Sequence, residues 1–482
     1  MNPITRRPSP EKIAMLNAIL ALGALFALSR LYKFWSGLKA VNYVPGMRSA
    51  FGARSNVGFL LRTRLNSTLF SNGLFEGDTD ITSVVPWLHG EPYVIVSSMK
   101  MMHQVLGYSD TYDKELSTTD LFGVNVATVR KGPWKRHRRI VHPSFSNKLY
   151  SLVWKESMQT FRDIIEAEGW DKTQSVAIPV LSDLTSKCTL TIVTSCAFGI
   201  RSPWSDSIAQ IGQGLPLGKC LELVTEDAPV RLLTPKWAYF LPIKAIKREK
   251  IAGEDVASDS AEGNNTIFNT IIKANMDGGK FAFDDEVIGN TFIMLFAGHE
   301  TTSRTLNALL TLLALYQEEQ EKAYQEIKRV LPDGRDPTFE DFESFTQIRN
   351  CIQETMRIYP SVNFIIREAM EDTQLNVTNR ATGDVSHTVV LEKGARVLVN
   401  VVGIHRNPRH FPDPDIFKSS RWDDDSIDTD AFAGFGQGPR ACIGRKFSLA
   451  EATCFVYCCS ATGESKLTWR RAKRASSGSE EF

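Results

Sequence analysis

The chain has 482 residues, and its 56 Lys and Arg residues balance its 55 Asp and Glu residues, for a formal net charge of +1. Because such a surface carries no global field that attracts nucleic acid, nucleic acid is excluded as a partner. The length allows one large core with a minor lobe, enough to bury a large cofactor. The eight cysteines form no Cys-x-x-Cys pair, which indicates reduced thiols and disfavours a disulfide framework or a zinc site.

An apolar run near the start of the chain, Ile13 to Leu28, is interrupted only by Asn17. Basic and aromatic residues flank it: Arg6, Arg7, Lys12, Arg30, Lys33 and Trp35. Such flanks hold helices at membrane interfaces, so the pattern predicts a transmembrane helix at about 13–30 within an anchor segment, residues 1–35. A cleaved signal peptide is the alternative, but it would imply a secreted, disulfide-bearing product, which the cysteines do not indicate.

Helical periodicity dominates between Tyr150 and Tyr359, and the stretch from Asp284 to Tyr316 is apolar on most faces, as a buried central helix is. Two period-two segments rich in β-branched residues, Pro92 to Ser97 and Thr388 to Val402, predict strands of a small sheet. The expected fold class is therefore mainly α with a minor β region (α+β), in a catalytic domain spanning residues 36–456.

The most distinctive segment is the glycine-rich loop Phe435-Gly-Gln-Gly-Pro-Arg-Ala-Cys-Ile-Gly444, which leads into an apolar helical stretch. Cys442 could be offered there to a haem iron as a thiolate, because glycines such as Gly436 let backbone N–H groups approach the sulfur. Arg440 would add a cation for a haem propionate. A turn with a buried structural cysteine is the alternative. A dinucleotide-binding loop is disfavoured, because the third glycine is missing at the required spacing.

This loop matches the pattern Phe-x-x-Gly-x-Arg-x-Cys-x-Gly at every fixed position. On these residues the chain resembles the cytochrome P450 family of haem-thiolate monooxygenases, in its microsomal, fungal-like form. The resemblance implies haem b with Cys442 as the axial iron ligand, and Phe435 and Gly436 as part of the cofactor-binding loop. It also implies electrons from NADPH through NADPH-cytochrome P450 reductase, with cytochrome b5 as a further possible donor.

The hexapeptide Ala297-Gly-His-Glu-Thr-Thr302 lies within the expected central helix. Its small residues leave room beside a flat cofactor, and Glu300 and Thr301 place an acid next to a hydroxyl. Because an acid in a core needs a task or a partner, this pattern favours a functional site. A helix kink with a solvated edge is the alternative. The resemblance implies that Thr301 hydrogen-bonds dioxygen and that Glu300 helps to relay protons.

Glu354 and Arg357 lie three residues apart on one face of a predicted helix, where they can pair. A capping-box pattern, Ser344-Phe-Thr-Gln347, predicts the start of this helix. Most such pairs are solvated surface pairs of little worth. The apolar remainder of the helix makes a buried pair plausible, and a buried pair would have a structural role.

The resemblance assigns roles to several further residues. Glu354 and Arg357 would pair with Arg421, although Ser419 and Ser420 stand where the family has a proline and an acid. Two residues four apart at the start of a predicted helix, Trp134 and Arg138, would contact the haem propionates, with Arg367 as a lesser candidate.

Two surfaces are candidates for contact with partners. A basic face for an acidic reductase would comprise Lys135, Arg136, Arg139, Arg445 and Lys446, with an ordinary solvated face as an equal alternative. Walls suited to a hydrophobic substrate would include Phe122, Phe292, Phe296, Val362 and Phe364, although such residues are more often plain core.

The resemblance further implies a single-pass enzyme of the endoplasmic reticulum membrane with its catalytic body in the cytosol. It would insert one oxygen atom from O2 into a lipophilic small molecule, such as a terpenoid or another secondary metabolite. Residues 457–482 are polar and basic where the family has apolar strands, and they are expected to form an atypical tail. A non-catalytic, degenerate haem-binding relative is therefore the alternative, and a haem isomerase or dehydratase is disfavoured by Glu300 and Thr301.

Overall fold

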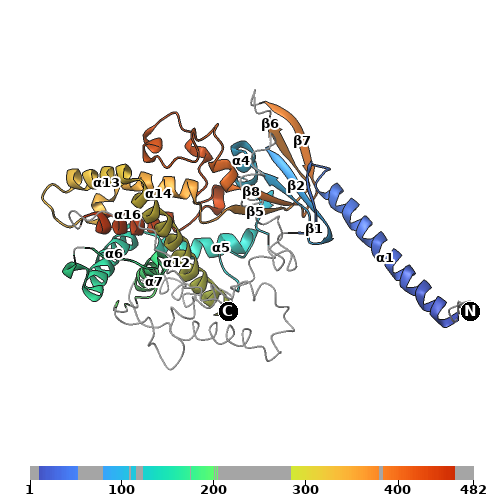
Figure 1. Ribbon diagram of the computed structural model, residues 1–482, viewed down its shortest axis with the longest axis horizontal. Coiled ribbons are helices and arrows are strands. Elements are labelled where there is room, and N and C mark those ends of the chain that lie inside the picture. Colours follow the sequence, from blue (N-terminus) through green and yellow to red (C-terminus); the bar gives the residue numbers. More distant parts are fainter. Residues whose placement is uncertain are drawn as a thin grey trace, which may run out of the picture. The chain divides into compact units, whose positions relative to one another are not determined.

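A computed structural model describes residues 10–52, 80–107, 110–115, 123–173, 175–199, 201, 204, 284–378 and 384–461 (Figure 1). The chain divides into two compact units. One comprises Met1–Glu115 with Phe364–Gly403, and the other Leu116–Asn363 with Ile404–Phe482. The first holds the strands and an N-terminal apolar helix, and the second is helical. The expected fold class, mainly α with a minor β region, is confirmed.

In the described part of the first unit, six strands form a mixed sheet in the order β1-β2-β3-β8-β5-β4, and β6 pairs with β7. The strands are β1 (Gly46–Phe51), β2 (Ile81–His89), β3 (Tyr93–Val96), β4 (Tyr112–Asp113), β5 (Phe364–Ala369), β6 (Thr373–Thr378), β7 (Val385–Leu391) and β8 (Arg396–Asn400). Val84 of β2, Ile95 of β3 and Leu398 of β8 form one buried apolar cluster within the sheet. Helix α4 (Met99–Gly107) follows β3.

Both strand predictions are confirmed in position. β3 falls on the first predicted segment, and β7 and β8 fall on the second, joined by a turn in which Gly394 has a φ of 88°. The second segment was predicted too long, because Val401 begins the short helix α15 (Val401–His405). Asn400 accounts for this stop: its side chain accepts a hydrogen bond from the Gly403 N–H at 3.0 Å, which satisfies a donor in the first turn.

The apolar N-terminal run lies within one helix, α1 (Pro10–Ala40), which is longer than the 13–30 span expected. Its described apolar side chains are exposed along most of the length, for example Leu22 and Leu25. From Ile13 to Ala40 it is long and apolar enough to cross a membrane, which a signal sequence would also satisfy. The helix ends where Asn42 and Tyr43 adopt left-handed φ values of 49° and 55°.

The second unit is a set of helices around one apolar core. Its described α-helices besides α15 are α5 (Lys131–Val141), α6 (Asn147–Glu168), α7 (Leu181–Phe198), α12 (Asp284–Leu315), α13 (Gln317–Val330), α14 (Thr346–Ile358) and α16 (Arg445–Ala461). Helix α12 is the predicted central helix, and its Leu306, Leu309 and Leu313 are buried in the core. The last expected helix is also confirmed as α16, which carries the chain away from the Cys442 loop.

One predicted cap is wrong. Helix α14 begins at Thr346 without a side-chain cap. Ser344 instead ends the 3-10 helix η7 (Phe339–Ser344), and the side chain of Gln347 donates to the Ser419 hydroxyl. The backbone N–H of Gln347 instead donates to Glu326 Oε1 of α13 at 2.7 Å. A carboxylate from a neighbouring helix thus supplies the acceptor that the sequence pattern assigned to a local serine.

Parts of two expectations lie outside the described residues. Helix α16 continues to Ala461, so the first residues of the expected tail are helical, and residues 462–482 are not described. Phe122, an expected pocket residue, is likewise outside the described part of the chain.

Candidate active site

The loop that carries Cys442 is closed by its own backbone. The N–H of Cys442 donates to the carbonyl of Phe435 at 2.9 Å, and the N–H of Gly436 donates to that of Ala433 at 2.9 Å. Gly436 and Gly438 have φ values of 66° and 68°, which residues with a Cβ adopt only at a cost. The glycines of the motif are therefore needed for this turn, which presents Cys442 just ahead of α16.

The Cys442 side chain is exposed, so the sulfur can be approached from outside the loop. Desolvation by the surrounding protein raises the pKa of the thiol, while the Gly444 N–H, Arg138 and Arg445 act in the opposite direction. These donors and cations are the ones a thiolate needs, and the first turn of α16 adds partial positive charge. Binding a metal ion would deprotonate such a thiol outright.

Two arginines connect this loop to α5. The guanidinium of Arg440 lies 4.2 Å from the ring centroid of Trp134, and its Nη2 donates to the Val129 carbonyl at 2.9 Å. Arg138 donates from Nη1 to the Ala441 carbonyl at 3.1 Å. The structure therefore brings Arg440, Trp134, Arg138 and the Cys442 loop together, and their predicted contacts with haem propionates stay a prediction. Arg367 is buried on β5 of the other unit and is described only there.

The hexapeptide of α12 has one buried and one open face. His299 is buried and its Nε2 lies 2.8 Å from the Ser186 hydroxyl of α7. A Cβ on Gly298 would come within 3.2 Å of Val193, also on α7, so this small residue serves helix packing. Ala297 is exposed and Thr301 half-buried, one turn apart, so these two residues leave the room that the sequence analysis assigned to the whole segment.

Thr301 sits in a small group of hydroxyls. Its Oγ1 donates to the Ala297 carbonyl at 2.8 Å, and its own carbonyl accepts from Ser361 Oγ at 3.1 Å and Thr305 Oγ1 at 2.9 Å. Because the Thr301 hydroxyl uses its hydrogen to bond the backbone, the lone pairs of its oxygen can still accept a hydrogen bond from another donor. Ser361 was not singled out from the sequence, since a lone serine after a helix carries no signal.

Glu300 has a partner, which is the other explanation that the sequence analysis allowed for an acid in this helix. Its Oε1 accepts from Arg304 Nε at 2.6 Å, one helical turn further along. The Arg304 side chain is 64% exposed and that of Glu300 is 21% exposed. An ion pair at this spacing and exposure contributes about 0.3–0.5 kcal/mol, too little to hold the carboxylate in one place.

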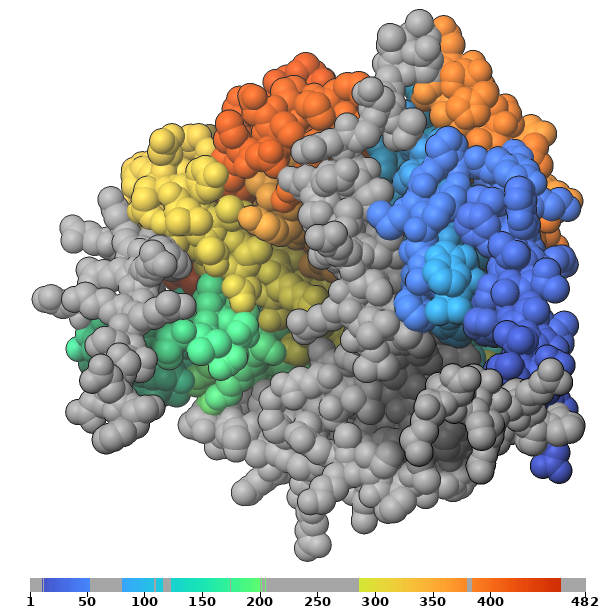
Figure 2. Space-filling view, turned by 45° about the vertical axis from the view of Figure 1, so that its right-hand side comes forward, coloured from blue at the N-terminus to red at the C-terminus, as the bar shows by residue number. Residues whose placement is uncertain are grey.

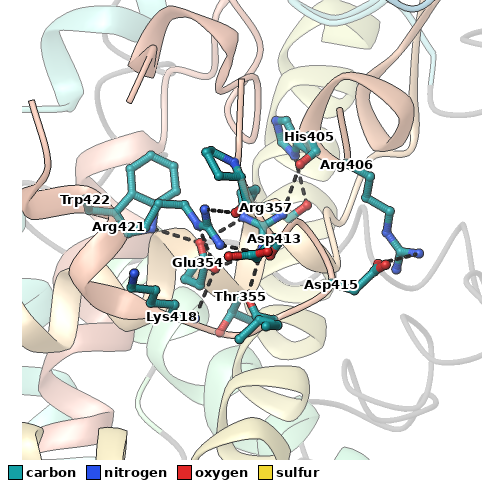
Figure 3. Close-up of polar contacts among 12 residues, drawn as sticks. Glu354, Thr355, Arg357, His405, Arg406, Asp413, Asp415, Lys418, Arg421 and Trp422 are labelled. Carbon is teal, nitrogen blue, oxygen red and sulfur yellow. Dashed lines mark hydrogen bonds and ion pairs between the residues drawn. The ribbon is translucent and has the colours of Figure 1, made fainter. Parts of the chain in front are cut away.

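Glu354, Arg357 and Arg421 form the predicted buried group (Figure 3). Glu354 Oε1 accepts from Arg357 Nη2 at 2.9 Å and from Arg421 Nε at 3.2 Å. Trp422, which the sequence analysis had not singled out, donates from Nε1 to the other oxygen of Glu354 at 3.2 Å. Arg357 also donates to the carbonyl of His405, the last residue of α15, at 3.0 Å and to that of Ile416 at 3.3 Å, so one residue of α14 holds two separate segments in place.

The unusual serine before Arg421 has a compensating partner. Ser419 is buried and its hydroxyl donates to Glu319 of α13, while Gln347 Nε2 donates to the same hydroxyl at 2.8 Å. The departure from the family's proline and acid therefore leaves Arg421 in place. At the position where the family pattern has a proline, Ser419 instead joins the 3-10 helix η8 (Ser419–Asp423) to helix α13 by its hydrogen bond to Glu319.

These residues fit a haem. An approachable thiol with cations and an N–H donor beside it suits the iron, and the guanidinium groups of Arg138 and Arg440 suit propionates. The exposed Ala297 leaves α12 without a bulky side chain at that point. Among the described residues there is no His, Cys, Asp and Glu group that could hold a separate metal ion.

Residues 82–216 and 235–459 match the family "Cytochrome P450". The chain belongs to the cytochrome P450 family. It is 32% identical over 472 residues to "Cytochrome P450 monooxygenase 124" of Postia placenta, covering 91% of this chain and 89% of that protein. It is 27% identical to "Cytochrome P450 monooxygenase ORF6" of Penicillium roqueforti, covering 68% and 66%, and 24% identical to "Cytochrome P450 3A41" of Mus musculus, covering 74% of each.

This cytochrome P450 is therefore an oxidoreductase of the monooxygenase family, and haem is the cofactor that the family implies. Its similarity to fungal relatives agrees with the fungal-like resemblance expected from the sequence.

Proposed function

We propose that this cytochrome P450 receives electrons from NADPH through a membrane-bound reductase, with cytochrome b5 as a further donor, and inserts one atom of O2 into a lipophilic small molecule. Haem, when bound, supplies the oxygen chemistry, and a thiolate ligand favours O–O bond cleavage. The observation that carries the proposal is the closed loop that offers the exposed Cys442 beside two arginines.

In this proposal Cys442 would hold the haem iron through its thiolate, and Phe435 and Gly436 shape the loop around that thiol. Arg440 and Arg138 would bind the propionates as charged, planar donors, and Trp134 holds Arg440 in orientation through its ring. Arg367 is the lesser candidate for the same task. Glu354, Arg357 and Arg421 have no contact with substrate in this account and stabilise the cofactor-bearing unit.

Thr301 and Glu300 would handle protons. The Thr301 hydroxyl donates to a backbone carbonyl and can accept a hydrogen bond, so it can hold a proton donor near its oxygen. Glu300 is weakly paired and partly open to water, so its carboxylate can exchange protons with solvent and pass them toward Thr301. These two groups would work as a unit on adjacent residues.

A lipophilic substrate is favoured by the aromatic residues of α12. The rings of Phe292 and Phe296, in the stretch of α12 directly before Ala297, stack with centroids 6.3 Å apart, and Val362 is 49% exposed. Apolar walls with few polar groups select hydrophobic ligands. A terpenoid or another secondary metabolite is the class we propose, with fungal monooxygenases among the relatives as support.

The reductase would dock on exposed cations near the Cys442 loop. Lys135 and Arg139 are exposed on α5 and suit an acidic partner. Of the other expected cations, Arg136 is paired with Glu286 at 2.5 Å, and Lys446 contacts the rings of Tyr150 and Phe339. Arg445 stacks on Phe435, so three of the five predicted cations also have structural contacts.

Location at the endoplasmic reticulum membrane, as a single-pass protein with its body in the cytosol, completes the proposal. Helix α1 supports it, because its apolar side chains are exposed and its mean hydropathy suits a bilayer. Cleavage as a signal peptide is disfavoured, because the last third of α1 packs on the sheet: Arg30 donates to the Leu88 carbonyl, and Gly37 lies against Val85.

The test is turnover by the full chain in lipid vesicles with a fungal NADPH-cytochrome P450 reductase. Terpenoid candidates are screened by mass spectrometry for products heavier by one oxygen atom, with isotopically labelled O2 to trace its source. Labelled product that needs both NADPH and the reductase supports the proposal. Haem uptake and NADPH oxidation without any oxygenated product, across the whole screen, would instead indicate a non-catalytic relative.

A further inference from the structure

Helix α1 packs directly against strand β2 of the sheet. Both elements belong to one unit, and Figure 2 shows them side by side. Arg30 Nη1 donates to the carbonyl of Leu88, near the end of β2, at 2.7 Å. Gly37, two turns further on, lies directly against the sheet, since a Cβ there would come within 2.8 Å of Val85 Cγ1.

The link from α1 to the sheet leaves no hinge. The segment 41–45 joins α1 to β1, and Val41 and Val44 within it are buried. The Val44 carbonyl accepts from Ser83 Oγ at 2.5 Å and from Arg48 Nη2 at 3.1 Å. Because both side chain and backbone of this segment are held by β1 and β2, the direction of α1 is fixed relative to the sheet.

The length of the apolar run then sets the height of the sheet above the bilayer. Residues 13–29 between Lys12 and Arg30 form about 25 Å of helix at 1.5 Å per residue. The hydrocarbon core of a bilayer is about 30 Å thick, so this run is short for a full span. Arg30 therefore cannot stand clear of the membrane and must lie in the interface, where arginine side chains reach toward headgroups.

The end of β2 is bound to Arg30 and must lie at the same depth. Trp87, beside Leu88 on this strand, is 43% exposed. Tyr32 and Trp35, on α1 just beyond Arg30, are 78% and 61% exposed. Tryptophan and tyrosine favour the interface between lipid and water, because their rings are apolar and their polar groups still reach water.

We propose that the end of β2 at Trp87 and Leu88 is seated in the phospholipid headgroup region beside Arg30, held there by the rigid contact of α1 with the sheet. This rests on the proposed membrane anchor and adds the surface through which the sheet unit meets lipid. Lipid is the one partner that fits, because the same unit already places an apolar helix next to these aromatic side chains.

Photo-crosslinking in nanodiscs that contain a labelled phospholipid tests this surface on the full chain. Three variants place the probe at different depths: Leu20→benzoylphenylalanine, Trp87→benzoylphenylalanine and Val385→benzoylphenylalanine. Val385 is the control, since it is exposed but lies at the opposite end of β7 from Glu392, about 20 Å away at 3.3 Å per residue. Glu392 itself is near α1, with its carboxylate 3.4 Å from Lys39 Nζ.

Lipid adducts from positions 20 and 87, and none from 385, are expected. An adduct at 20 without one at 87 would overturn the seated β2 end and leave the anchor intact. No adduct at position 20 would contradict the membrane anchor itself, and the proposed lipid contact of β2 would be contradicted with it.

Two glycines in α1 supply a matched pair of variants. Gly37→Leu should push the helix off Val85 and lower the adduct yield at position 87 at least about 3-fold, with the yield at 20 unchanged, because the span itself is intact. Gly23→Leu should change neither, since nothing lies within 4 Å of its Cβ position. Arg30→Met, which removes the hydrogen bond to Leu88 along with local contacts to Ser29 and Phe26 inside α1, checks the same contact with β2 if Gly37→Leu folds poorly. Equal yields at 87 in all three variants would contradict a rigid contact.

Discussion

Glu354 and Arg357 form a two-bonded ion pair that is completely buried, with Nε and Nη2 each 2.9 Å from a carboxylate oxygen. A guanidinium in the core needs a counter-charge and acceptors for its N–H groups, so the stability of Arg357 there depends on this one acid and on the carbonyls around it.

Replacing the acid should therefore be severe. Glu354→Ala leaves Arg357 buried without its counter-charge and releases Arg421, so we expect a loss of about 3–5 kcal/mol in the free energy of unfolding. Urea denaturation followed by circular dichroism measures it. Arg335→Ala is the matched control, because Arg335 also makes two bonds to one carboxylate, that of Asp341, but at the surface. It should leave the denaturation midpoint nearly unchanged, and equal losses in both variants would contradict this account.

Glu451 should make the protein less stable as pH rises. It is fully buried in α16, neither carboxylate oxygen has a hydrogen-bond partner among the described residues, and burial raises its pKa well above the usual range. The folded protein keeps this group neutral, whereas the unfolded chain releases the proton above about pH 4.5, so unfolding becomes easier with pH at up to about 1.4 kcal/mol per unit.

Glu451→Gln removes that slope. The variant should have a higher thermal midpoint than the parent at pH 8 and a similar one near pH 4.5. Parallel midpoint-versus-pH curves for the two proteins would show that Glu451 releases its proton as readily in the folded protein as in the unfolded chain, which would contradict this prediction.

His405 should act in the opposite direction. Its Nε2 accepts the Ala433 N–H at 2.8 Å and its Nδ1 lies 3.1 Å from the Arg357 carbonyl, so the ring is held in one neutral tautomer. Burial lowers its pKa to about 3. Below about pH 6.5 the histidine binds a proton in the unfolded chain but not in the folded protein. The free energy of unfolding therefore decreases progressively as the pH falls from 6.5 toward 3.

His405→Gln keeps an acceptor for Ala433 without the titration. We expect a lower denaturation midpoint at pH 7.5 from lost packing, together with a weaker loss between pH 6.5 and 5 than in the parent protein. An unchanged slope in that window would assign the acid sensitivity to other groups.

Thr301→Ala should separate NADPH consumption from product formation. Loss of the hydroxyl removes the group proposed to hold a proton donor, so product per NADPH should fall by about 10²-fold while NADPH oxidation continues. Thr311→Ala is the control, because Thr311 makes the same bond to the carbonyl four residues earlier, 2.8 Å to Asn307, on the same helix. If both variants lose coupling equally, the effect comes from the helix and not from the Thr301 hydroxyl.

The sequence predicted those parts of the site that depend on local pattern. The Cys442 loop, the long α12 and the Glu354–Arg357 spacing each follow from residues close together in the chain, where turn and helix geometry decide the outcome. The contacts it missed join distant segments. The cap of α14 comes from Glu326, the partner of Ser419 is Glu319, and Ser361 reaches Thr301, none of which leaves a periodic signal.

Some misassignments have a packing cause. Gly298 was read as space for a cofactor, but helix α7 occupies that side through Val193. The α12 sequence is apolar on most faces, so periodicity alone could not say which face meets a neighbouring helix and which stays open.

The central claim is that Cys442 binds haem iron as a thiolate. The most direct measurement is the carbon-monoxide difference spectrum of the reduced full chain, beside Cys442→Ala and the control Cys459→Ala, whose thiol lies in α16 away from the loop. We expect the Soret band characteristic of thiolate ligation in the parent protein and in Cys459→Ala, and its loss in Cys442→Ala. Haem bound without that band in the parent protein, or the same band in Cys442→Ala, would contradict the account.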